Sequence, residues 1–528
     1  MAEFDIVVIG AGHNGLTLAA YLAKKGLSVA VLESRPVAGG GLCTEEPLLP
    51  GFLHNMHSNF HLWPDYAPAW SDLQIERFGM KYLHPSIPWS APLSKGRSIL
   101  IHNRTSTTEK SFAKYSRKDA RAYAKIKTDI DRIFAKLMLA TVYSVPREPN
   151  PEAEKLISKL GWFSPDWFRM TPFEVADEIF EDETVKTFIL ANIWFAGWAP
   201  DYENMGDLVP TFIGLCNHMY LPSGGTARLA HTLSRIVAHF GGRVFVNAPV
   251  RRILVDKEAR AIGVALDERR TSNPLLRGEV EIMARKAVVS ATDVTTTFLE
   301  FLDGDCLDAD FRKRVERFDY RGNALFNVHF ELDEAPKYAD RSVDLGWSQD
   351  IGYENYDDLK DDLSALERGQ LPSTPRYEAG VNTLFDKSYA PPGKHVAIAY
   401  REVPNTDKFS GGRDKLEAIK EEYADRVLER WAEYAPNMTK SNVIARYVYS
   451  PFEYERKIVS MRTGNWSLGR MDYAQSGTRR PLRGYSDYRT PVKQLYMCSS
   501  SCHPGGSIFL AAGYNAANVI LDDLKLSE

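Results

Sequence analysis

Residues 4–33 read FDIVVIGAGHNGLTLAAYLAKKGLSVAVLE, and this stretch decides the fold. FDIVVI is short, apolar and β-branched, which predicts a buried parallel strand. The glycine turn GAGHNG follows at once, and LTLAAYLAKK then carries apolar residues at helical spacing up to Gly26. LSVAVLE predicts a second strand, which ends in Glu33. A strand, a glycine-rich turn, a helix and a strand are typical of a doubly wound α/β fold.

Each residue type in this turn has a physical reason. Gly10 allows the tight turn, Gly12 lets the backbone approach a pyrophosphate, and Gly15 lets the helix pack on the sheet. The helix N-terminus offers N–H groups and the positive end of its dipole to phosphate. Glu33 lies 18 residues past Gly15, where a carboxylate can accept hydrogen bonds from ribose hydroxyls. The motif predicts a dinucleotide without a 2′-phosphate, but it does not separate NAD from FAD.

Composition excludes several other classes of protein. A chain of 528 residues is too long for one core and should hold two to four domains. Because 65 basic residues face 69 acidic ones, the net charge is −4, and we expect no binding of nucleic acid. The five cysteines contain no CxxC pair, which favours a reducing compartment. No apolar run can span a bilayer and no signal peptide precedes the first strand, so we expect a cytoplasmic protein or one peripheral on a membrane.

A second glycine-rich stretch, SRPVAGGGLCTEE at residues 34–46, follows Glu33 directly. It resembles the second glycine motif of the FAD-dependent amine oxidase and carotenoid desaturase superfamily. In that superfamily the backbone of the motif lies along the flavin side of the pyrophosphate. The resemblance therefore implies that the cofactor is FAD.

Three later stretches carry the same resemblance: PSGG at 222–225, YRTPV at 488–492 and LYMCSSSCHPGG at 495–506. Together with GAGHNGL at 10–16, they make the chain resemble the phytoene dehydrogenase-like flavoproteins. The branch that it resembles most is named pyridine nucleotide-disulfide oxidoreductase domain-containing protein 2. The resemblance implies a Rossmann-type FAD-binding domain of the glutathione-reductase-like kind.

The resemblance also implies a domain organisation. The FAD-binding domain would be discontinuous, formed by residues 1–90, 220–300 and 480–528. The stretches 91–219 and 301–479 would form an inserted substrate domain with a mixed sheet and helices. Strand-like runs at 325–332 and 395–401 and a charged helix at about 413–434 fit this α/β architecture.

The resemblance extends to individual cofactor-binding residues. The strand around Val250 would touch the adenine through its backbone, and the strand before Ala291 would pass near the cofactor. Gly505 and Gly506 would let the backbone approach the flavin ring, and the helix from about 511 to 524 would point its N-terminus at the ring. Ser500 stands where many flavoproteins place an acid on the ribityl chain. The predicted cofactor-binding residues are Gly10, Gly12, Asn14, Gly15, Glu33, Ser34, Arg35, Gly39, Gly40, Thr44, Val250, Ala291, Ser500, Gly505, Gly506, Gly513 and Asn515.

Two histidines are candidates for an acid or base. His503 lies in the loop expected to approach the flavin, although a structural role in that loop is the alternative. His57 belongs to GFLHNMHSNFH, a segment that lies near the ring in related flavoproteins. His54, His57 and His61 are spaced as metal ligands on a helix would be, but the stretch does not read as a helix and we expect no metal.

Aromatic residues gather at 52–70 and at 162–198. They favour an apolar cavity facing the flavin, with ordinary core packing or a membrane-docking patch as alternatives. A basic helix expected at 108–139 would suit peripheral contact with an anionic membrane, or it is simply a solvated face.

These features predict an FAD-dependent dehydrogenase, desaturase or oxidase that removes hydride from a mainly apolar small molecule to flavin N5. Oxygen, a quinone or another protein would accept the electrons. The alternatives are a flavin-dependent isomerase of C=C bonds, an amine oxidase, and a flavin-containing scaffold associated with a membrane.

Overall fold

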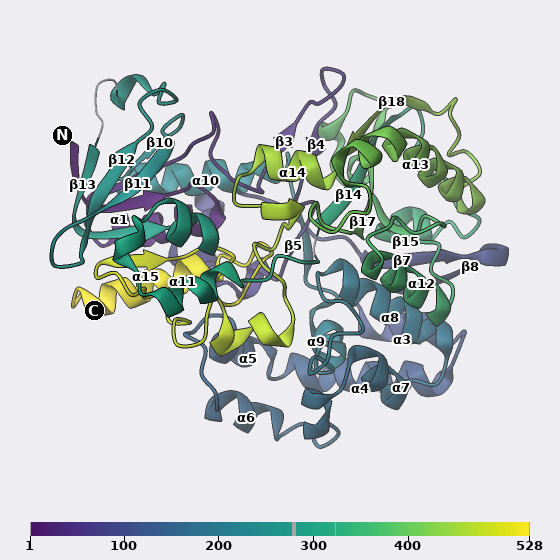
Figure 1. The fold of residues 1–528 in the computed structure, drawn as a ribbon. Coiled ribbons are helices and arrows are strands. Elements are labelled where there is room, and N and C mark those ends of the chain that lie inside the picture. Colours follow the sequence, from purple (N-terminus) through teal and green to yellow (C-terminus); the bar gives the residue numbers. More distant parts are fainter. Residues whose placement is uncertain (1, 277–280, 323, 527–528) are drawn as a thin grey trace.

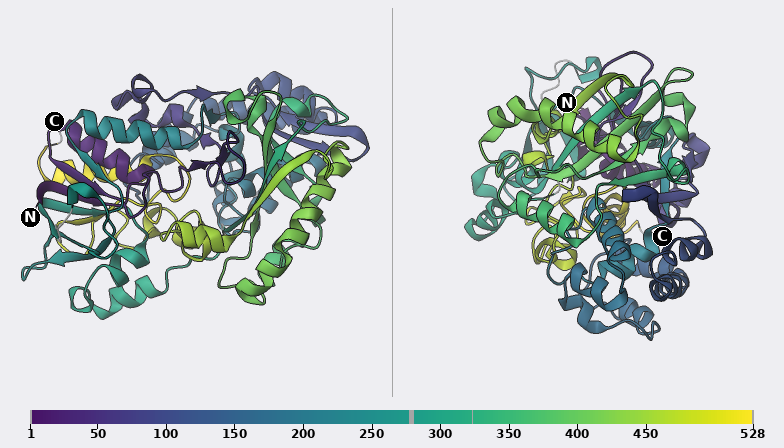
Figure 2. Two further views of the ribbon diagram at one scale, coloured as in Figure 1. Left: turned by 90° about the horizontal axis from the view of Figure 1, so that it is seen from above. Right: turned by 90° about the vertical axis from the view of Figure 1, so that its right-hand side faces the viewer.

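The computed structural model describes residues 2–276, 281–322 and 324–526. Its two largest sheets have seven strands each. The first sheet lies on the left of Figure 1 and the second on the right, and Figure 2 shows them from two further sides. Within the described residues, no helix combines the length and the apolar character needed to cross a membrane.

The first sheet has the order β10-β2-β1-β13-β12-β11, and β19 pairs with β13. Strand β1 pairs in parallel with β2 on one side and with β13 on the other. Because these strands are buried on both faces, their sequences read as continuous apolar runs. The strands are β1 (Ala2–Ile9), β2 (Val29–Leu32), β10 (Arg243–Phe245), β11 (Val250–Val255), β12 (Ala261–Leu266), β13 (Glu281–Ser290) and β19 (Leu495–Met497).

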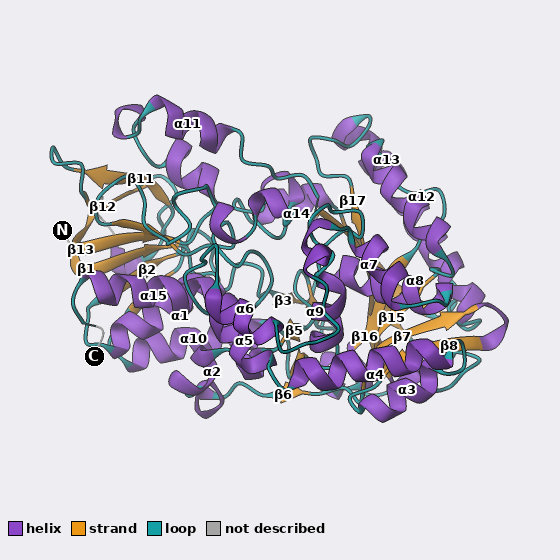
Figure 3. Cartoon of the chain, turned by 90° about the horizontal axis from the view of Figure 1, so that it is seen from below, coloured by secondary structure: helices purple, strands orange, loops and turns teal. Residues whose placement is uncertain are grey.

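Helices cover both faces of this sheet (Figure 3). Helix α1 (His13–Lys24) packs against α10 (Ala227–His239) and α15 (Ala511–Asp523), and α11 (Ala309–Glu316) lies over the opposite face. This confirms the predicted Rossmann-type fold. The carboxyl ends of β1, β2 and β13 meet at one edge, where such folds bind their ligands.

The second sheet is mixed, with the order β18-β14-β17-β16-β15-β7-β8. Its strands are β7 (Ile87–Leu93), β8 (Arg97–Ile101), β14 (Ala324–Leu332), β15 (Gly346–Ile351), β16 (Tyr377–Val381), β17 (His395–Val403) and β18 (Val443–Tyr449). Helix α13 (Gly412–Tyr434) packs against the apolar residues of this sheet through Trp431, and it lies beside α12 (Tyr356–Glu367). The predicted strands and charged helix of this part are confirmed. Strand β7 runs across the expected domain boundary at residue 90, and the boundaries themselves remain a prediction.

A layer of helices packs against the second sheet. It consists of α3 (Thr105–Phe112), α4 (Arg117–Asp131), α5 (Phe134–Thr141), α6 (Pro151–Ile157), α7 (Pro172–Ile179), α8 (Glu183–Phe195) and α9 (Leu208–Leu215). The prediction of one basic helix at 108–139 is wrong, because Ser116 starts α4 by accepting a hydrogen bond from the Asp119 N–H at 3.1 Å. Lys127 of α4 is buried and pairs with Asp131, so the basic residues do not form one exposed face.

Short elements connect the two sheets. They are β3 (Thr44–Glu45), β4 (His54–Asn55), β5 (His61–Leu62), β6 (Tyr82–Leu83), β9 (Met219–Pro222), α2 (Pro68–Asp72) and α14 (Pro451–Lys457). Strand β9 pairs with both β5 and β6, which ties the chain before α10 to the chain that follows the second glycine motif.

Candidate functional site

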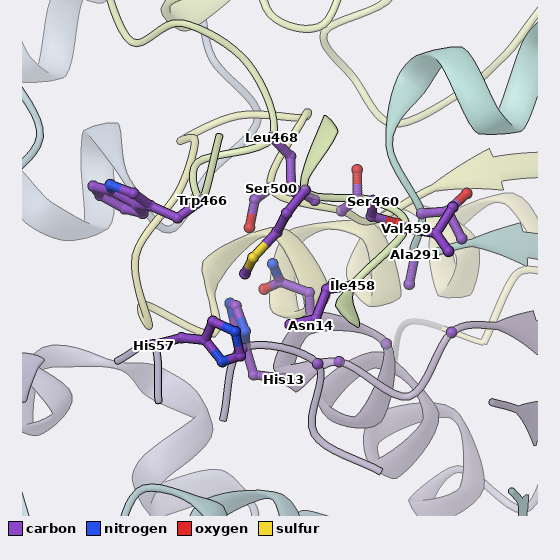
Figure 4. A pocket seen from close by; sticks show the side chains of 18 of the residues that line it. His13, Asn14, His57, Ala291, Ile458, Val459, Ser460, Trp466, Leu468 and Ser500 are labelled. Carbon is purple, nitrogen blue, oxygen red and sulfur yellow. The ribbon is translucent and has the colours of Figure 1, made fainter. Parts of the chain in front are cut away.

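A cavity of about 590 Å³ opens at the carboxyl edge of the first sheet and reaches the second sheet. Gly10, Gly12 and Glu33 line one part, and Leu325 of β14 and Tyr400 of β17 line another. Figure 4 shows His13, Asn14 and His57 beneath this space and Leu468 and Ser500 above it. The site therefore joins the predicted nucleotide turn to the part of the chain expected to bind substrate.

The glycines of the turn differ in what surrounds them. A Cβ atom added to Gly12 would meet no protein atom within 4 Å, whereas one added to Gly15 would lie 2.3 Å from the Gly10 carbonyl oxygen. Gly15 is thus needed for packing of helix on strand, and Gly12 borders open space. No side chain caps α1, so its N-terminal N–H groups are available to an anion.

Glu33 and the second glycine motif are hydrogen-bonded to this turn. The Glu33 carboxylate accepts hydrogen bonds from the N–H groups of Ala11 and Arg35, each at 2.9 Å. The Gly39 N–H donates to the Ala11 carbonyl at 2.8 Å, and a parallel bridge joins Gly39 to Gly12. The two motifs therefore form one cradle at the end of β1.

Thr44 supports the site from outside the cavity. Its hydroxyl donates to Asn55 Oδ1 at 2.8 Å and accepts from the Ala227 N–H at 3.1 Å. A Cβ atom on Gly225 would lie 2.4 Å from the Thr44 hydroxyl oxygen, so the PSGG stretch packs directly on the TEE stretch. This contact accounts for Gly225 and Thr44 in the two stretches.

The structure brings most of the predicted cofactor-binding residues together at the cavity wall. The residues that line it are Gly10, Gly12, Asn14, Gly15, Glu33, Ser34, Arg35, Gly40, Val250, Ala291 and Ser500. Six predicted residues, all within the described part of the chain, do not line the cavity: Gly39, Thr44, Gly505, Gly506, Gly513 and Asn515. Gly513 packs on Asn14, whose Oδ1 accepts from the Gly513 N–H at 3.3 Å, and Asn515 bonds to Tyr488 instead. The role of all seventeen residues in cofactor binding remains a prediction, and the cavity wall contains eleven of them.

His503 lies behind the cavity wall, not in it. Its Nε2–H donates to the Thr141 carbonyl at 2.7 Å, and burial lowers its pKa to about 4. This contact ties the C-terminal loop to the end of α5. The geometry favours the structural role for His503, and its catalytic role remains a prediction.

Arg480 organises the same loop, and sequence reasoning missed it. Its side chain is fully buried, and all of its hydrogen bonds go to backbone carbonyls. The guanidinium contacts the Ser500 carbonyl at 2.7 Å and the Ser467 carbonyl at 2.9 Å. Burial lowers its pKa to about 10, so it stays charged at neutral pH. A lone arginine carries no sequence pattern that would reveal this role.

His57 lines the cavity and is buried. Its Nε2 lies 3.1 Å from the Tyr449 hydroxyl, which also lies 3.5 Å from the Glu453 carbonyl. With its proton on Nε2, His57 donates to the phenol oxygen and leaves the phenol proton for the Glu453 carbonyl; with its proton on Nδ1, the phenol donates to His57 Nε2. His57 Nδ1 has no hydrogen-bond partner. Burial, with the nearby charges of Lys457 and Arg35, holds the pKa of His57 well below its usual range.

The three closely spaced histidines do not share a helical face. His54 lies in β4, with Nε2 3.6 Å from a Glu331 carboxylate oxygen. His61 lies in β5 and bonds to the Thr226 hydroxyl at 2.9 Å. Within the described residues, no group of three or more His, Cys, Asp or Glu side chains is arranged to hold a metal ion.

Beyond the glycine motifs, the cavity wall carries many apolar side chains beside polar ones such as Asn59 and Lys457. The apolar ones include Phe60, Leu62, Phe195, Leu325, Trp466 and Leu468. Phe60 and Phe195 come from the two predicted aromatic clusters, whereas Trp63, Trp167 and Trp194 pack in the core of the helical layer. The wall residues at 456–468 come from α14 and irregular loops, which show no periodicity that a sequence could reveal.

Tyr400 adds one polar group to this wall, with two buried acids behind it. Glu378 of β16 is its direct cross-strand neighbour, and Asp350 of β15 is the neighbour of Glu378. Burial raises the pKa of Glu378 to about 8, and burial with the charge of Glu378 raises that of Asp350. Asn192 of α8 donates to the Asp350 carboxylate at 2.7 Å.

Comparison with known proteins agrees with this geometry. Residues 8–74 match the family model described as an NAD(P)-binding Rossmann-like domain. The chain is 29% identical to a subunit of limonene dehydrogenase from Castellaniella defragrans, over 99% of this chain and 96% of that protein. It is 31% identical to mouse pyridine nucleotide-disulfide oxidoreductase domain-containing protein 2, over 99% and 94%. The fold is similar to cyclohexylamine oxidase from Brevibacterium oxydans, with a TM-score of 0.58, 15% identity and 99% of each chain covered.

The mouse relative exceeds 30% identity over almost the full length of both proteins. The residues present fit FAD. The glycine motifs and the uncapped N-terminus of α1 offer open backbone for the pyrophosphate, and the acid that follows β2 offers a carboxylate for the ribose. The chain therefore belongs to the family of pyridine nucleotide-disulfide oxidoreductase domain-containing protein 2, within the amine oxidase and carotenoid desaturase superfamily of FAD-dependent oxidoreductases.

Proposed function

We propose that the protein oxidises a mainly apolar small molecule in this cavity, leaving a new C=C or C=O bond. One observation carries the proposal: a single cavity is lined by the glycine cradle and also by the apolar side chains of Phe60, Phe195 and Leu325. The similarity to a limonene dehydrogenase, an enzyme named for the oxidation of an apolar molecule, supports it. Bound FAD supplies the acceptor for the hydride.

The side chains of the cavity would divide the remaining work. The N-terminus of α1 and the Gly12 backbone would hold the pyrophosphate, and Glu33 would bind the adenosine ribose. Phe195, Leu325 and their apolar neighbours would orient the substrate and exclude water. Burial and positioning are the contributions that an apolar wall can make.

His57 would accept the proton that accompanies oxidation. In the tautomer in which Nε2–H donates to Tyr449, the free lone pair would lie on Nδ1, a buried atom without a hydrogen-bond partner. Because its pKa is held low, the imidazole is neutral at pH 7 and has a lone pair to accept with, but it would hold the proton only weakly. Tyr449 would fix the tautomer and the orientation of the ring.

Anaerobic loss of flavin absorbance tests the proposal. The holoprotein is mixed in turn with limonene as an apolar hydrocarbon and with putrescine as an amine, and mass spectrometry measures the masses of the products. Bleaching with limonene and a product lighter by two hydrogens is the expected result. An isomer of unchanged mass would favour the isomerase, and bleaching by putrescine alone would favour the amine oxidase. Photoreduction without bleaching by any substrate class would favour a scaffold.

The acceptor, the cellular location and membrane contact belong to the same proposal. Oxygen, a quinone or a protein would reoxidise the flavin, and a cytoplasmic or peripheral position on a membrane suits an apolar substrate. Flotation with anionic lipid vesicles tests the peripheral contact, since a bound protein rises with the vesicles.

A further inference from the structure

A second hollow of about 450 Å³ lies on the surface, and its wall shares no residue with the cofactor cavity. Four arginines line it. Arg314 and Arg317 come from the end of α11 and the residue that follows it, and Arg479 and Arg483 come from the loop before β19. Phe318, Tyr473, Pro481 and Leu482 complete most of the wall.

The positive charge of this hollow is largely uncompensated. Arg479 pairs with Glu148 at 2.8 Å and lies 3.8 Å over the Tyr473 ring. Arg314 donates to the Arg483 carbonyl, and Arg317 and Arg483 are exposed. Within the residues that the structure describes, no ion pair reaches Arg314, Arg317 or Arg483. In a chain with a net charge of −4, four guanidinium groups here face one carboxylate, which makes the hollow attractive to anions.

The hollow lies directly behind the loop that forms part of the cavity wall. Arg479 and Pro481 belong to its wall, and Arg480 between them turns inward. The Arg480 guanidinium contacts the Ser500 carbonyl at 2.7 Å, and Ser500 lines the cofactor cavity. One buried side chain therefore separates the basic hollow from the place where the cofactor binds.

We propose that the basic hollow is the docking site of the electron acceptor, a carrier protein that presents a carboxylate-rich face. The inference rests on the proposed function, which needs an acceptor, and adds the chemistry that recognises it. Charge complementarity argues for an acidic partner, since two of the four arginines project into solvent. The contact of Arg480 with the cavity-lining Ser500 argues for electron transfer as the reason for docking at this place.

Ferricyanide serves as a small anionic probe of the site. The FAD-loaded protein is reduced by light without substrate, with EDTA as the electron donor that is oxidised, so a failed substrate screen does not affect this experiment. Two ferricyanide ions then take one electron each and become ferrocyanide, and the protons released on reoxidation pass to water. The return of flavin absorbance gives the rate in stopped flow at low ionic strength.

The informative variant combines Arg317→Glu with Arg483→Glu. Its control combines Lys95→Glu with Arg117→Glu, two exposed cations in other parts of the chain, which changes the net charge by the same amount. We expect reoxidation by ferricyanide to slow roughly tenfold or more in the first variant only, because steering by local charge is worth that much. Reoxidation by the cationic tris(phenanthroline)cobalt(III) should become faster, and that by neutral benzoquinone should not change.

Added salt provides a second measurement that needs no variant. It should slow ferricyanide in the wild type by screening the arginines, with little effect on benzoquinone. An unchanged ferricyanide rate in the arginine variant would overturn the proposal. Equal slowing with all three acceptors would overturn it too, because the substitutions would then act on the cofactor site and not on docking.

Discussion

The side chain of Glu33 accepts a hydrogen bond from the backbone N–H of Ala11 at 2.9 Å, so the acid that ends β2 is fixed to the turn that ends β1. Its other carboxylate oxygen accepts from the Arg35 N–H, also at 2.9 Å. Each oxygen of a carboxylate has two lone pairs, so the oxygen bound to Ala11 keeps one for a ribose hydroxyl. Glu33 therefore has a structural role and keeps an acceptor for the predicted ribose contact.

Replacement of Glu33 tests the binding role. In Glu33→Gln the amide nitrogen cannot accept a hydrogen bond, and the charge that strengthens the ribose contact is lost. Hydrogen bonds to charged groups contribute about 1.5–3 kcal/mol, so the Kd for FAD should rise roughly 10- to 100-fold. Titration of the apoprotein with FAD, followed by flavin fluorescence, measures this. Glu3→Gln, at the opposite end of β1, is the control, and equal Kd values for both variants would contradict the assignment.

Replacements of two glycines in the turn should affect different properties, FAD binding for Gly12 and stability for Gly15. Gly12→Val places its side chain in open cavity, so the protein should fold, keep a near-normal Tm as apoprotein and bind no FAD. Gly15→Ala forces a Cβ to within 2.3 Å of the Gly10 carbonyl oxygen, so its Tm should fall. Calorimetry and the FAD released on boiling measure the two effects. Normal FAD content in Gly12→Val would show that this turn does not hold the pyrophosphate.

Much of the first sheet could be predicted because its signal is local. The apolar run of β1, the glycine turn and the helical spacing of α1 lie in consecutive residues, and each has a period or a steric demand that a sequence displays. The same holds for β14, β17 and α13. The single helix expected at 108–139 failed because Ser116 offers a side-chain cap inside an otherwise continuous pattern.

The cavity wall was harder to predict because it is assembled from distant segments. Trp194 belongs to an aromatic cluster that as a whole favoured a cavity, and its indole N–H donates to Glu402 at 2.8 Å in the core. Trp466, in an irregular loop, lines the cavity instead. Arg480 gains its role only when the loops around Ser467 and Ser500 fold onto it. None of these relationships has a sequence period.

The two candidate histidines can be separated by experiment. His57→Gln keeps a polar side chain beside Tyr449 but cannot take up a proton, so flavin reduction by substrate should slow roughly 10²-fold or more at full FAD occupancy. His503→Gln should reduce that rate little and lower the Tm, because the bond to the Thr141 carbonyl is lost. Stopped-flow reduction and calorimetry on the same samples provide both numbers. The opposite pattern would return the catalytic role to His503.

Glu378 should make the protein less stable as pH rises. Burial in the second sheet raises its pKa from 4.5 to about 8, so between these values the unfolded chain releases a proton that the folded chain keeps. The free energy of unfolding then falls by up to about 1.4 kcal/mol per pH unit across this window. Glu378→Gln, which imitates the neutral acid, should match the wild type near pH 4.5 and have a higher Tm near pH 8. Glu429→Gln, exposed on α13, is the control and should follow the wild type. Parallel plots of Tm against pH for Glu378→Gln and wild type would show that Glu378 is ionised in the folded protein.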